Sequence, residues 1–171
     1  MLYAGAQKNI GPSGLAIIVI KKELIKEKEN LPAMMQYKTY ADSDSMYNTP
    51  PTFAWYLSGM VFKWLKKNGG LLNQKAVNES KANALYSFID ESSFYMNDID
   101  KVSRSLMNVL FLLNDDSLNS KFLSEAESNG LLNLGGHRSV GGMRASIYNG
   151  VPKEGVDSLI SFMKEFEKSN G

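Results

Sequence analysis

A single lysine among small residues is the first place where this sequence could do covalent chemistry. Lys8 lies in a segment from Ala4 to Gly14 that is rich in alanine, glycine and other short side chains. A lysine amine attacks a carbonyl carbon only in its neutral form, which a crowded and partly apolar setting favours. The residues alone leave open an ordinary surface lysine in a turn. The glycine spacing matches neither a phosphate-binding loop nor a dinucleotide signature, so Gly11 and Gly14 are interpreted as turn residues.

A second candidate is a His-Arg step between two pairs of glycines. His137 and Arg138 lie between Gly-Gly pairs, and Arg144 follows at the start of a predicted strand. Glycine lets backbone amides approach an anion closely, and the planar guanidinium of arginine matches phosphate and carboxylate. Two arginines therefore predict a ligand with two anionic groups. A flexible hairpin with solvated arginines is the alternative that the residues leave open.

The composition excludes several other kinds of chemistry. The 171 residues include no cysteine and 1 histidine, which excludes thiol nucleophiles, disulfides and thiolate metal sites and disfavours zinc sites built on histidines. We therefore expect no metal. A net charge of +1 creates no field that would attract nucleic acid or a membrane surface, so neither is an expected partner. The lack of cysteine and of a long apolar run predicts a soluble, cytoplasmic protein.

The N-terminal elements must position the lysine. The continuous apolar run from Leu15 to Ile20 predicts a strand covered on both faces. The capping residues and prolines from Asn48 to Thr52 precede apolar residues spaced three or four apart, which predicts a helix ended by Gly69. Trp55 and Trp64 are expected in the core.

The rest of the chain alternates helices and strands. A helix is predicted from about Leu72 to Glu91, and a domain boundary near Lys75 divides the chain into residues 1–75 and 76–171. The pattern then predicts strands at 106–113 and 143–148 and helices at 117–129 and 153–168. Such alternation is typical of a small α/β layer.

Three motifs, in this order along the chain, resemble the phosphoserine aminotransferase family. They are Ala4-Gly5-Ala6-Gln7-Lys8-Asn9-Ile10-Gly11-Pro12, Asn48-Thr49-Pro50-Pro51-Thr52-Phe53-Ala54-Trp55-Tyr56-Leu57 and Gly136-His137-Arg138-Ser139-Val140-Gly141-Gly142-Met143-Arg144-Ala145-Ser146-Ile147-Tyr148-Asn149. The resemblance runs along the whole chain, but such enzymes are considerably longer, so it implies their C-terminal half. The implied fold is α/β, the C-terminal part of a fold-type-I transferase dependent on pyridoxal 5'-phosphate. Residues 1–75 would end the large cofactor-binding domain, and residues 76–171 would form the small C-terminal α/β domain.

The resemblance also implies which residues bind the cofactor. Lys8 would hold pyridoxal phosphate covalently as a Schiff base, with Gln7 beside it. Asn48 and Thr49 would reach the cofactor phosphate of the neighbouring subunit in a homodimer, and their amide and hydroxyl donors suit that task. The family's tryptophan that stacks on the cofactor and its aspartate at the pyridine nitrogen would precede Met1.

The resemblance assigns the glycine-rich segment to the substrate. His137 and Arg138 would receive the substrate phosphate, and Arg144 would bind the substrate carboxylate. This agrees with the two anionic groups that the arginines predict on their own.

The implied activity is phosphoserine transamination in serine biosynthesis. Phosphoserine and 2-oxoglutarate would be converted to phosphohydroxypyruvate and glutamate, and some family members also aminate a phosphorylated precursor of vitamin B6. Two alternatives stay open: an aminotransferase of the same fold that uses another acid, and a non-catalytic fragment that binds anions or is only structural. The isolated chain is expected to be inactive.

Overall fold

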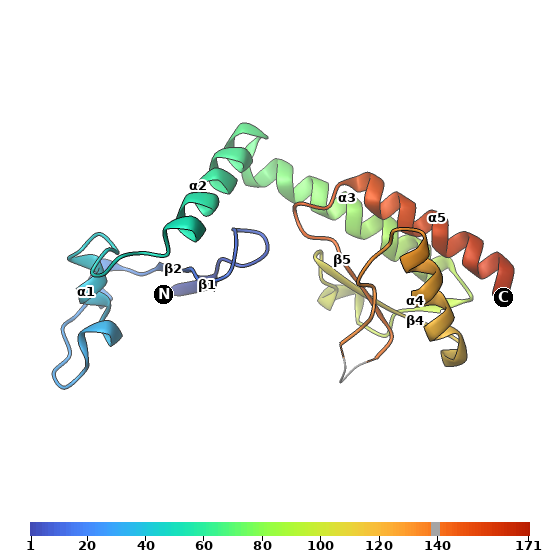
Figure 1. Cartoon of the computed structure of the whole chain (residues 1–171), viewed down its shortest axis with the longest axis horizontal. Coiled ribbons are helices and arrows are strands. Elements are labelled where there is room, and N and C mark those ends of the chain that lie inside the picture. Colours follow the sequence, from blue (N-terminus) through green and yellow to red (C-terminus); the bar gives the residue numbers. More distant parts are fainter. Residues whose placement is uncertain (138–140) are drawn as a thin grey trace. The chain divides into compact units, whose positions relative to one another are not determined.

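The computed structural model describes residues 1–137 and 141–171. The described chain forms two compact units, which we call unit 1 (Met1–Asn68) and unit 2 (Gly69–Gly171) (Figure 1). Each unit has its own elements and is described by itself. The boundary predicted near Lys75 would fall within the first helix of unit 2, and the division into residues 1–75 and 76–171 stays a prediction.

Unit 1 begins with an antiparallel hairpin and ends with a long helix. β1 (Leu2–Gly5) pairs with β2 (Ala16–Val19), and Leu2 lies opposite Val19. The elements that follow are η1 (Lys22–Leu24), η2 (Ala33–Met35), α1 (Tyr37–Ala41) and α2 (Thr52–Lys67). The predicted strand and the predicted helix are confirmed as β2 and α2, whereas β1 has no recognisable start signal in the sequence.

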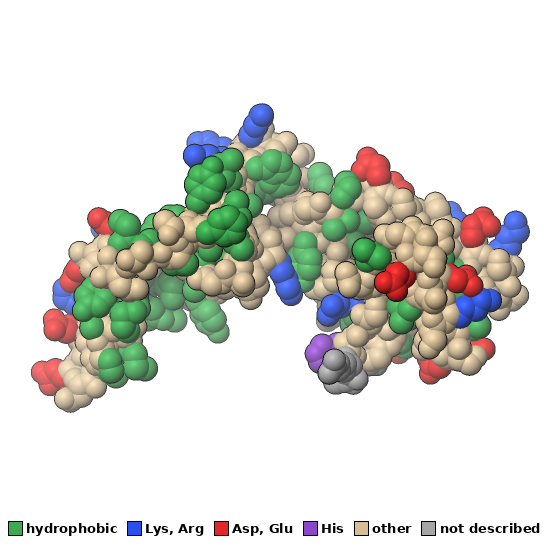
Figure 2. Space-filling model, viewed as in Figure 1, with side chains coloured by type: hydrophobic (Ala, Val, Ile, Leu, Met, Phe, Trp, Pro, Cys, Tyr) green, Lys and Arg blue, Asp and Glu red, His purple; other side chains and the backbone are tan. Residues whose placement is uncertain are grey.

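The predicted burial of β2 on both faces is wrong. Ile18 is 41% exposed and Val19 is 62% exposed, and the only strand paired with β2 among the described residues is β1. A two-stranded ribbon covers little of either face, so its apolar side chains stay accessible. Figure 2 shows hydrophobic side chains of this kind gathered on the surface of unit 1.

The helix α2 ends as predicted but begins without the predicted cap. Gly69 has φ 85° directly after the C-cap residue, which confirms the glycine stop. The residue before the helix is Pro51, and no side chain caps the first amides. A capping side chain comes from the residue directly before the helix. Pro50 and Pro51 lie between Thr49 and the first residue of the helix, so neither Asn48 nor Thr49 can take this role.

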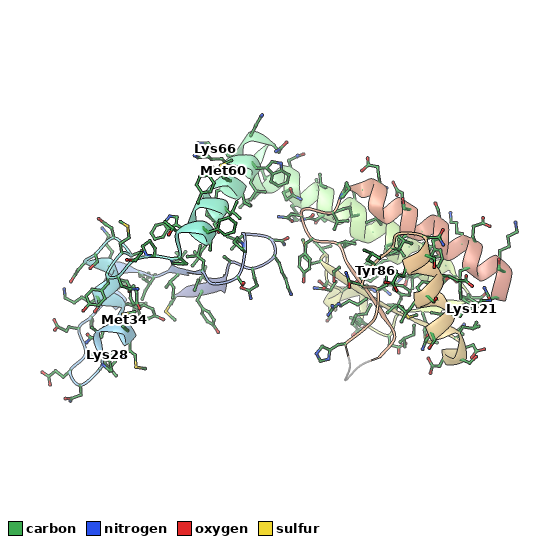
Figure 3. All side chains as sticks on the ribbon, in the orientation of Figure 1. Lys28, Met34, Met60, Lys66, Tyr86 and Lys121 are labelled. Atoms are coloured by element: carbon green, nitrogen blue, oxygen red, sulfur yellow. The ribbon has the colours of Figure 1, made fainter. Side chains whose placement is uncertain are left out.

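The predicted burial of the α2 tryptophans is also wrong. Trp55 is 39% exposed and Trp64 is 45% exposed. Met60, labelled in Figure 3, lies on the same helix and is exposed as well. The residues that α2 buries are small, Ala54 and Ser58. Because the buried residues of α2 are small, backbone segments of unit 1 can approach this helix closely. The helix does not build a large apolar core.

Unit 2 is a three-stranded antiparallel sheet with helices packed on one face. The strand order is β3 (Tyr95–Met96), β4 (Asn108–Leu113) and β5 (Met143–Ser146). Alternate residues of β4 are buried, so one face of the central strand points into the core. The other elements are α3 (Gly70–Glu91), η3 (Lys101–Ser103), η4 (Asp116–Leu118), α4 (Asn119–Ser128) and α5 (Lys153–Asn170). The predicted small α/β layer is confirmed, and the short β3 is the strand that the sequence pattern missed.

Aromatic rings hold the helices of unit 2 to its sheet. Phe122 of α4 packs edge-on against four rings, with centroid distances of 6.1 Å to Tyr95, 5.8 Å to Phe111, 5.2 Å to Phe162 and 5.0 Å to Phe166. Such pairs contribute roughly 0.5–1.5 kcal/mol each beyond the burial of their area. Figure 1 shows α3 and α5 side by side, and both helices contribute buried residues to this core.

A buried lysine joins α3 to the turn after β5. Lys81 is 0% exposed. Its Nζ donates to three backbone oxygens, those of Ile147 at 3.1 Å, Tyr148 at 2.9 Å and Val151 at 2.8 Å. Burial lowers the pKa of the Lys81 ammonium below its ordinary value of 10.5. Three acceptors match the three protons of the ammonium group, so carbonyl dipoles compensate the buried charge.

An ion pair fixes the C-terminal end of α3 to the loop that follows. The Nη1 and Nη2 atoms of Arg104 donate to the Asp90 carboxylate at 2.8 and 2.7 Å. The same guanidinium lies over the ring of Tyr86, 4.6 Å from its centroid, and Figure 3 labels this tyrosine. The hydrogen bonds from Arg104 hold the pKa of the Asp90 carboxyl below its ordinary value of 3.8.

We expect Lys81→Met to lower the free energy of unfolding by about 2–4 kcal/mol, because it leaves buried carbonyl oxygens without their donor while it keeps most of the side-chain volume. Urea unfolding followed by circular dichroism measures this change. The matched control is Lys75→Met on the same helix, where the lysine is 66% exposed and pairs with Glu79 at 3.6 Å. The control should cost less than about 0.5 kcal/mol, and equal losses would contradict the role given to Lys81.

We expect Asp90→Asn to destabilise the chain by about 1–2 kcal/mol at neutral pH, because it removes a bidentate, charge-assisted pair. The pKa of Asp90 is lower in the folded chain than its ordinary 3.8, so its contribution is complete above that value and is lost as the pH falls through the folded pKa. The difference from the parent chain should therefore shrink in acid. Glu91→Gln, at the next position, is the control, and a difference that stays constant from pH 7 to strong acid would refute the pair's role.

Candidate functional site

Backbone hydrogen bonds around a buried alanine build the Lys8 turn. Ala6 is 0% exposed, and its N–H donates to the oxygen of Leu15 at 2.8 Å. Its own oxygen accepts from the N–H of Ile10 at 3.2 Å and from that of Gly11 at 2.8 Å. These bonds close the chain between residues 6 and 11, so that residues 7–10 project as a tight turn between β1 and β2.

Lys8 adopts a left-handed backbone conformation in this turn. Its φ is 84°, a conformation that costs a residue with a side chain roughly 1–2 kcal/mol. The Lys8 side chain is exposed, and so is Gln7, whose side chain lies against Gly5. Backbone strain of this kind concentrates at functional sites. The structure therefore presents the lysine amine on a fixed and strained turn.

The Lys8 turn contacts α2 through two small residues. A Cβ atom placed on Gly11 would lie 2.5 Å from the Oγ of Ser58, closer than real Cβ atoms approach such neighbours. Ser58 is 2% exposed, and its hydroxyl has no hydrogen-bond partner among the described residues. Sequence reasoning interpreted Gly11 only as a turn residue and missed Ser58, because the contact joins positions far apart in the chain.

Asn48 and Thr49 lie in the loop that leads into α2. Both are exposed, and the Nδ2 of Asn48 donates to the Thr49 oxygen at 3.4 Å. That distance is too long for a strong hydrogen bond. The amide and hydroxyl donors are therefore accessible to a ligand.

In unit 2, glycines close the loop that carries His137. The N–H of Gly136 donates to the oxygen of Gly142 at 2.9 Å, and the N–H of Gly141 donates to the oxygen of His137 at 2.8 Å. Gly142 has φ 62°, and a Cβ there would lie 2.9 Å from the oxygen of Phe111. The structure thus requires glycine at this position for close backbone packing against the sheet.

The predicted anion-binding residues lie along this loop and the strand after it. His137 is exposed at the start of the loop, while Arg138 lies outside the described residues. Arg144 lies on β5 opposite Leu110, and the backbone N–H of Arg144 donates to the backbone oxygen of Leu134 at 2.7 Å. The buried Nε of Arg144 has no hydrogen-bond partner in residues 1–137 and 141–171. An unsatisfied buried guanidinium N–H is suited to an anionic ligand.

A polar group beside Arg144 was not predicted. The side chain of Asn108 on β4 bonds the hydroxyl of Tyr148 at 3.0 Å and accepts from the Oγ of Ser146 at 3.3 Å. Ser146 lies two residues after Arg144 and opposite Asn108, so the three share the sheet face away from the core. Polar residues at alternate positions of β5 were the available signal.

The candidate residues thus fall into two groups, one in each unit. Lys8, Gln7, Asn48 and Thr49 lie in unit 1, and His137 and Arg144 lie in unit 2. Within the described ranges, no three carboxylate or histidine side chains gather as a metal site. No helix of those ranges is long and apolar enough to cross a membrane.

Comparison with known proteins relates the whole chain to one group of enzymes. The Aminotransferase class-V family model matches residues 1–159. The phosphoserine aminotransferase of Hahella chejuensis is 57% identical over 171 residues, which cover 99% of this chain and 47% of that protein. The phosphoserine aminotransferase of Pseudomonas syringae pv. syringae is 56% identical over 172 residues, with 100% of this chain and 48% of that protein covered.

Solved structures give the same result. Phosphoserine aminotransferase from Bacillus circulans subsp. alkalophilus is similar with a TM-score of 0.95 and 44% identity, over 99% of this chain and 47% of that one. The pyridoxal-phosphate-bound phosphoserine aminotransferase of Trichomonas vaginalis has a TM-score of 0.87 and 39% identity, over 95% of this chain and 47% of that one. The chain spans about half the length of the relatives it matches.

Proposed function

This chain belongs to the class-V aminotransferase family. We propose that it forms part of a phosphoserine aminotransferase of serine biosynthesis. The observation that carries the proposal is 56–57% identity to phosphoserine aminotransferases along the whole chain. The proposed reaction converts phosphoserine and 2-oxoglutarate to phosphohydroxypyruvate and glutamate. Because the chain spans about half the length of those relatives, the activity is proposed for a protein of their length.

The residues of unit 1 fit pyridoxal phosphate as the cofactor. Lys8 is an exposed residue on a fixed turn, and the exposed residues Asn48 and Thr49 offer donors for a phosphate group. We assign Lys8 to covalent attachment, with Gln7 beside it. Asn48 and Thr49 are assigned to the cofactor phosphate of the other subunit in a homodimer. Bound pyridoxal phosphate supplies a ring that withdraws electrons from the substrate Cα.

Lys8 has two successive tasks in this proposal. Its Nζ holds the cofactor until the substrate amine takes that position. The freed Nζ would then accept the proton from the substrate Cα as a general base and, once protonated, would act as the general acid that passes this proton to carbon C4′ of the cofactor. The left-handed turn fixes the backbone from which the Lys8 side chain extends, since the N–H groups of Ile10 and Gly11 donate to the oxygen of Ala6.

The residues of unit 2 select a substrate with two anionic groups. His137 and Arg138 bind the substrate phosphate, and Arg144 binds the carboxylate that phosphoserine and glutamate share. The unsatisfied Nε of Arg144 supports this assignment, because a carboxylate oxygen is the strong acceptor that a buried guanidinium N–H requires. We also propose that the enzyme is cytoplasmic, in keeping with a chain that has no cysteine.

A chimera tests the role of Lys8. These 171 residues replace the matching segment of the Hahella chejuensis relative, and the purified protein is reduced with borohydride in the presence of pyridoxal phosphate. Peptide mapping should find the cofactor on Lys8, and Lys8→Ala should abolish transamination, since no other residue of this chain takes the position that the proposal gives to Lys8. Lys21→Ala, an exposed lysine after β2, is the control. Label on another lysine would overturn the assignment.

Two arginine variants of the chimera test the substrate site. Arg138→Ala should lower kcat/KM for phosphoserine by about 10–100-fold, the loss of one charge-assisted contact to phosphate, and should change that for glutamate much less. Arg144→Ala should lower both values, since both substrates carry the carboxylate. Equal losses for the two substrates in Arg138→Ala would contradict the phosphate role.

A further inference from the structure

The contact between Gly11 and Ser58 connects the Lys8 turn to α2. Ser58 is 2% exposed in a helix that otherwise buries only Ala54 among its described residues. A Cβ on Gly11 would lie 2.5 Å from the Ser58 Oγ, but 3.4 Å from its Cα and 3.5 Å from its Cβ. The close approach therefore depends on one atom, the serine hydroxyl oxygen.

Gly11 also closes the turn on which Lys8 lies. Its N–H donates to the oxygen of Ala6 at 2.8 Å, and it forms a β-bridge with Gln7. A displacement of Gly11 must therefore stretch the bond to Ala6 or change the backbone at Gln7, next to the strained Lys8. The position of the helix surface at Ser58 thus sets the position of the turn.

The size of Ser58, and not its hydrogen bonding, explains this contact. The buried hydroxyl has no hydrogen-bond partner among the described residues, so its removal leaves no donor or acceptor unsatisfied. Gly11 is not one of the glycines with positive φ, so its backbone accepts a side chain. Steric contact with Ser58 is the obstacle to a side chain there.

We propose that Gly11 is a positioning residue for Lys8: its lack of a side chain lets the turn lie against Ser58 of α2, which holds the turn where the lysine amine can attach the cofactor. The inference rests on the proposed function, because it concerns the reactivity of Lys8 toward pyridoxal phosphate. It extends the site to Gly11, which acts through the backbone and need not touch cofactor or substrate.

The test compares Gly11→Ala, Ser58→Ala and the double variant in the chimera. Each protein is titrated with pyridoxal phosphate, and the visible absorbance of the lysine linkage and borohydride labelling of Lys8 are measured. We expect Gly11→Ala to weaken labelling by about tenfold or more, since a displacement of about 1 Å at a reacting group costs up to 100-fold. Ser58→Ala should stay within about twofold of the parent, and the double variant should recover most of the loss, because the clashing oxygen is gone.

The matched control is Gly59→Ala, since a Cβ at that neighbouring α2 position meets nothing within 4 Å. It should label like the parent. Normal labelling of Gly11→Ala, or a double variant no better than the single one, would overturn the proposal. A Gly11→Ala protein with a lower melting temperature but unchanged labelling would show a merely structural contact and would also overturn it.

Hydrogen exchange separates this proposal from the proposed function. If the parent chimera does not label at Lys8, the proposed function fails, and the exchange of the position-11 amide, which bonds Ala6, still measures the turn. Faster exchange in Gly11→Ala that the double variant reverses would support the positioning of the turn by Ser58. Unchanged exchange would refute it, whatever the activity.

Discussion

Unit 2 depends on a positive charge that is buried without a carboxylate. Lys81 is held by three carbonyl oxygens of the turn between β5 and α5, so one side chain fixes α3, the end of a strand and the start of a helix together. One turn earlier on α3, Asn78 donates to the side chain of Asn149 at 2.8 Å. This bond is a second link between α3 and the turn that joins β5 to α5. Carbonyl dipoles compensate the ammonium only while all these elements keep their places. The strand that carries Arg144 is therefore anchored to the longest helix of the unit.

In unit 1, interactions of another kind hold the Lys8 turn in place. Its strands and its helix α2 leave large apolar side chains exposed, so a packed core contributes little to its order. The Lys8 turn is instead fixed by backbone bonds to the buried Ala6 and by the approach of Gly11 to Ser58. A methyl group inserted into such a close contact forces the neighbouring backbone to shift, as overpacking does in a core. A single added methyl group can therefore matter more in unit 1 than many surface changes.

The sequence allowed good prediction of what is local and poor prediction of what is not. The helices α2 to α5 and the strands β4 and β5 follow from three- and four-residue spacing, apolar runs and glycine stops within each segment. Lys8, Arg138 and Arg144 were identified as candidate site residues by their type and their neighbours. The left-handed backbone of Lys8 and the burial of Lys81 could not be foreseen, because distant segments impose them. Lys81 lies four residues before the buried Leu85, but its acceptors are 66 or more residues away.

Three cations of unit 2 show why Arg144 in particular is suited to an external ligand. Lys81 is saturated by backbone oxygens, and Arg104 is neutralised by the two oxygens of Asp90 and covered by a ring. Arg144 lies opposite Leu110, whose side chain offers no acceptor, and the buried Nε of Arg144 has no partner among the described residues. A buried N–H without an acceptor costs folding free energy, and a carboxylate bound there would recover it. Of the two arginines that the structure describes, Arg144 is thus the one with a buried N–H that an external anion could satisfy.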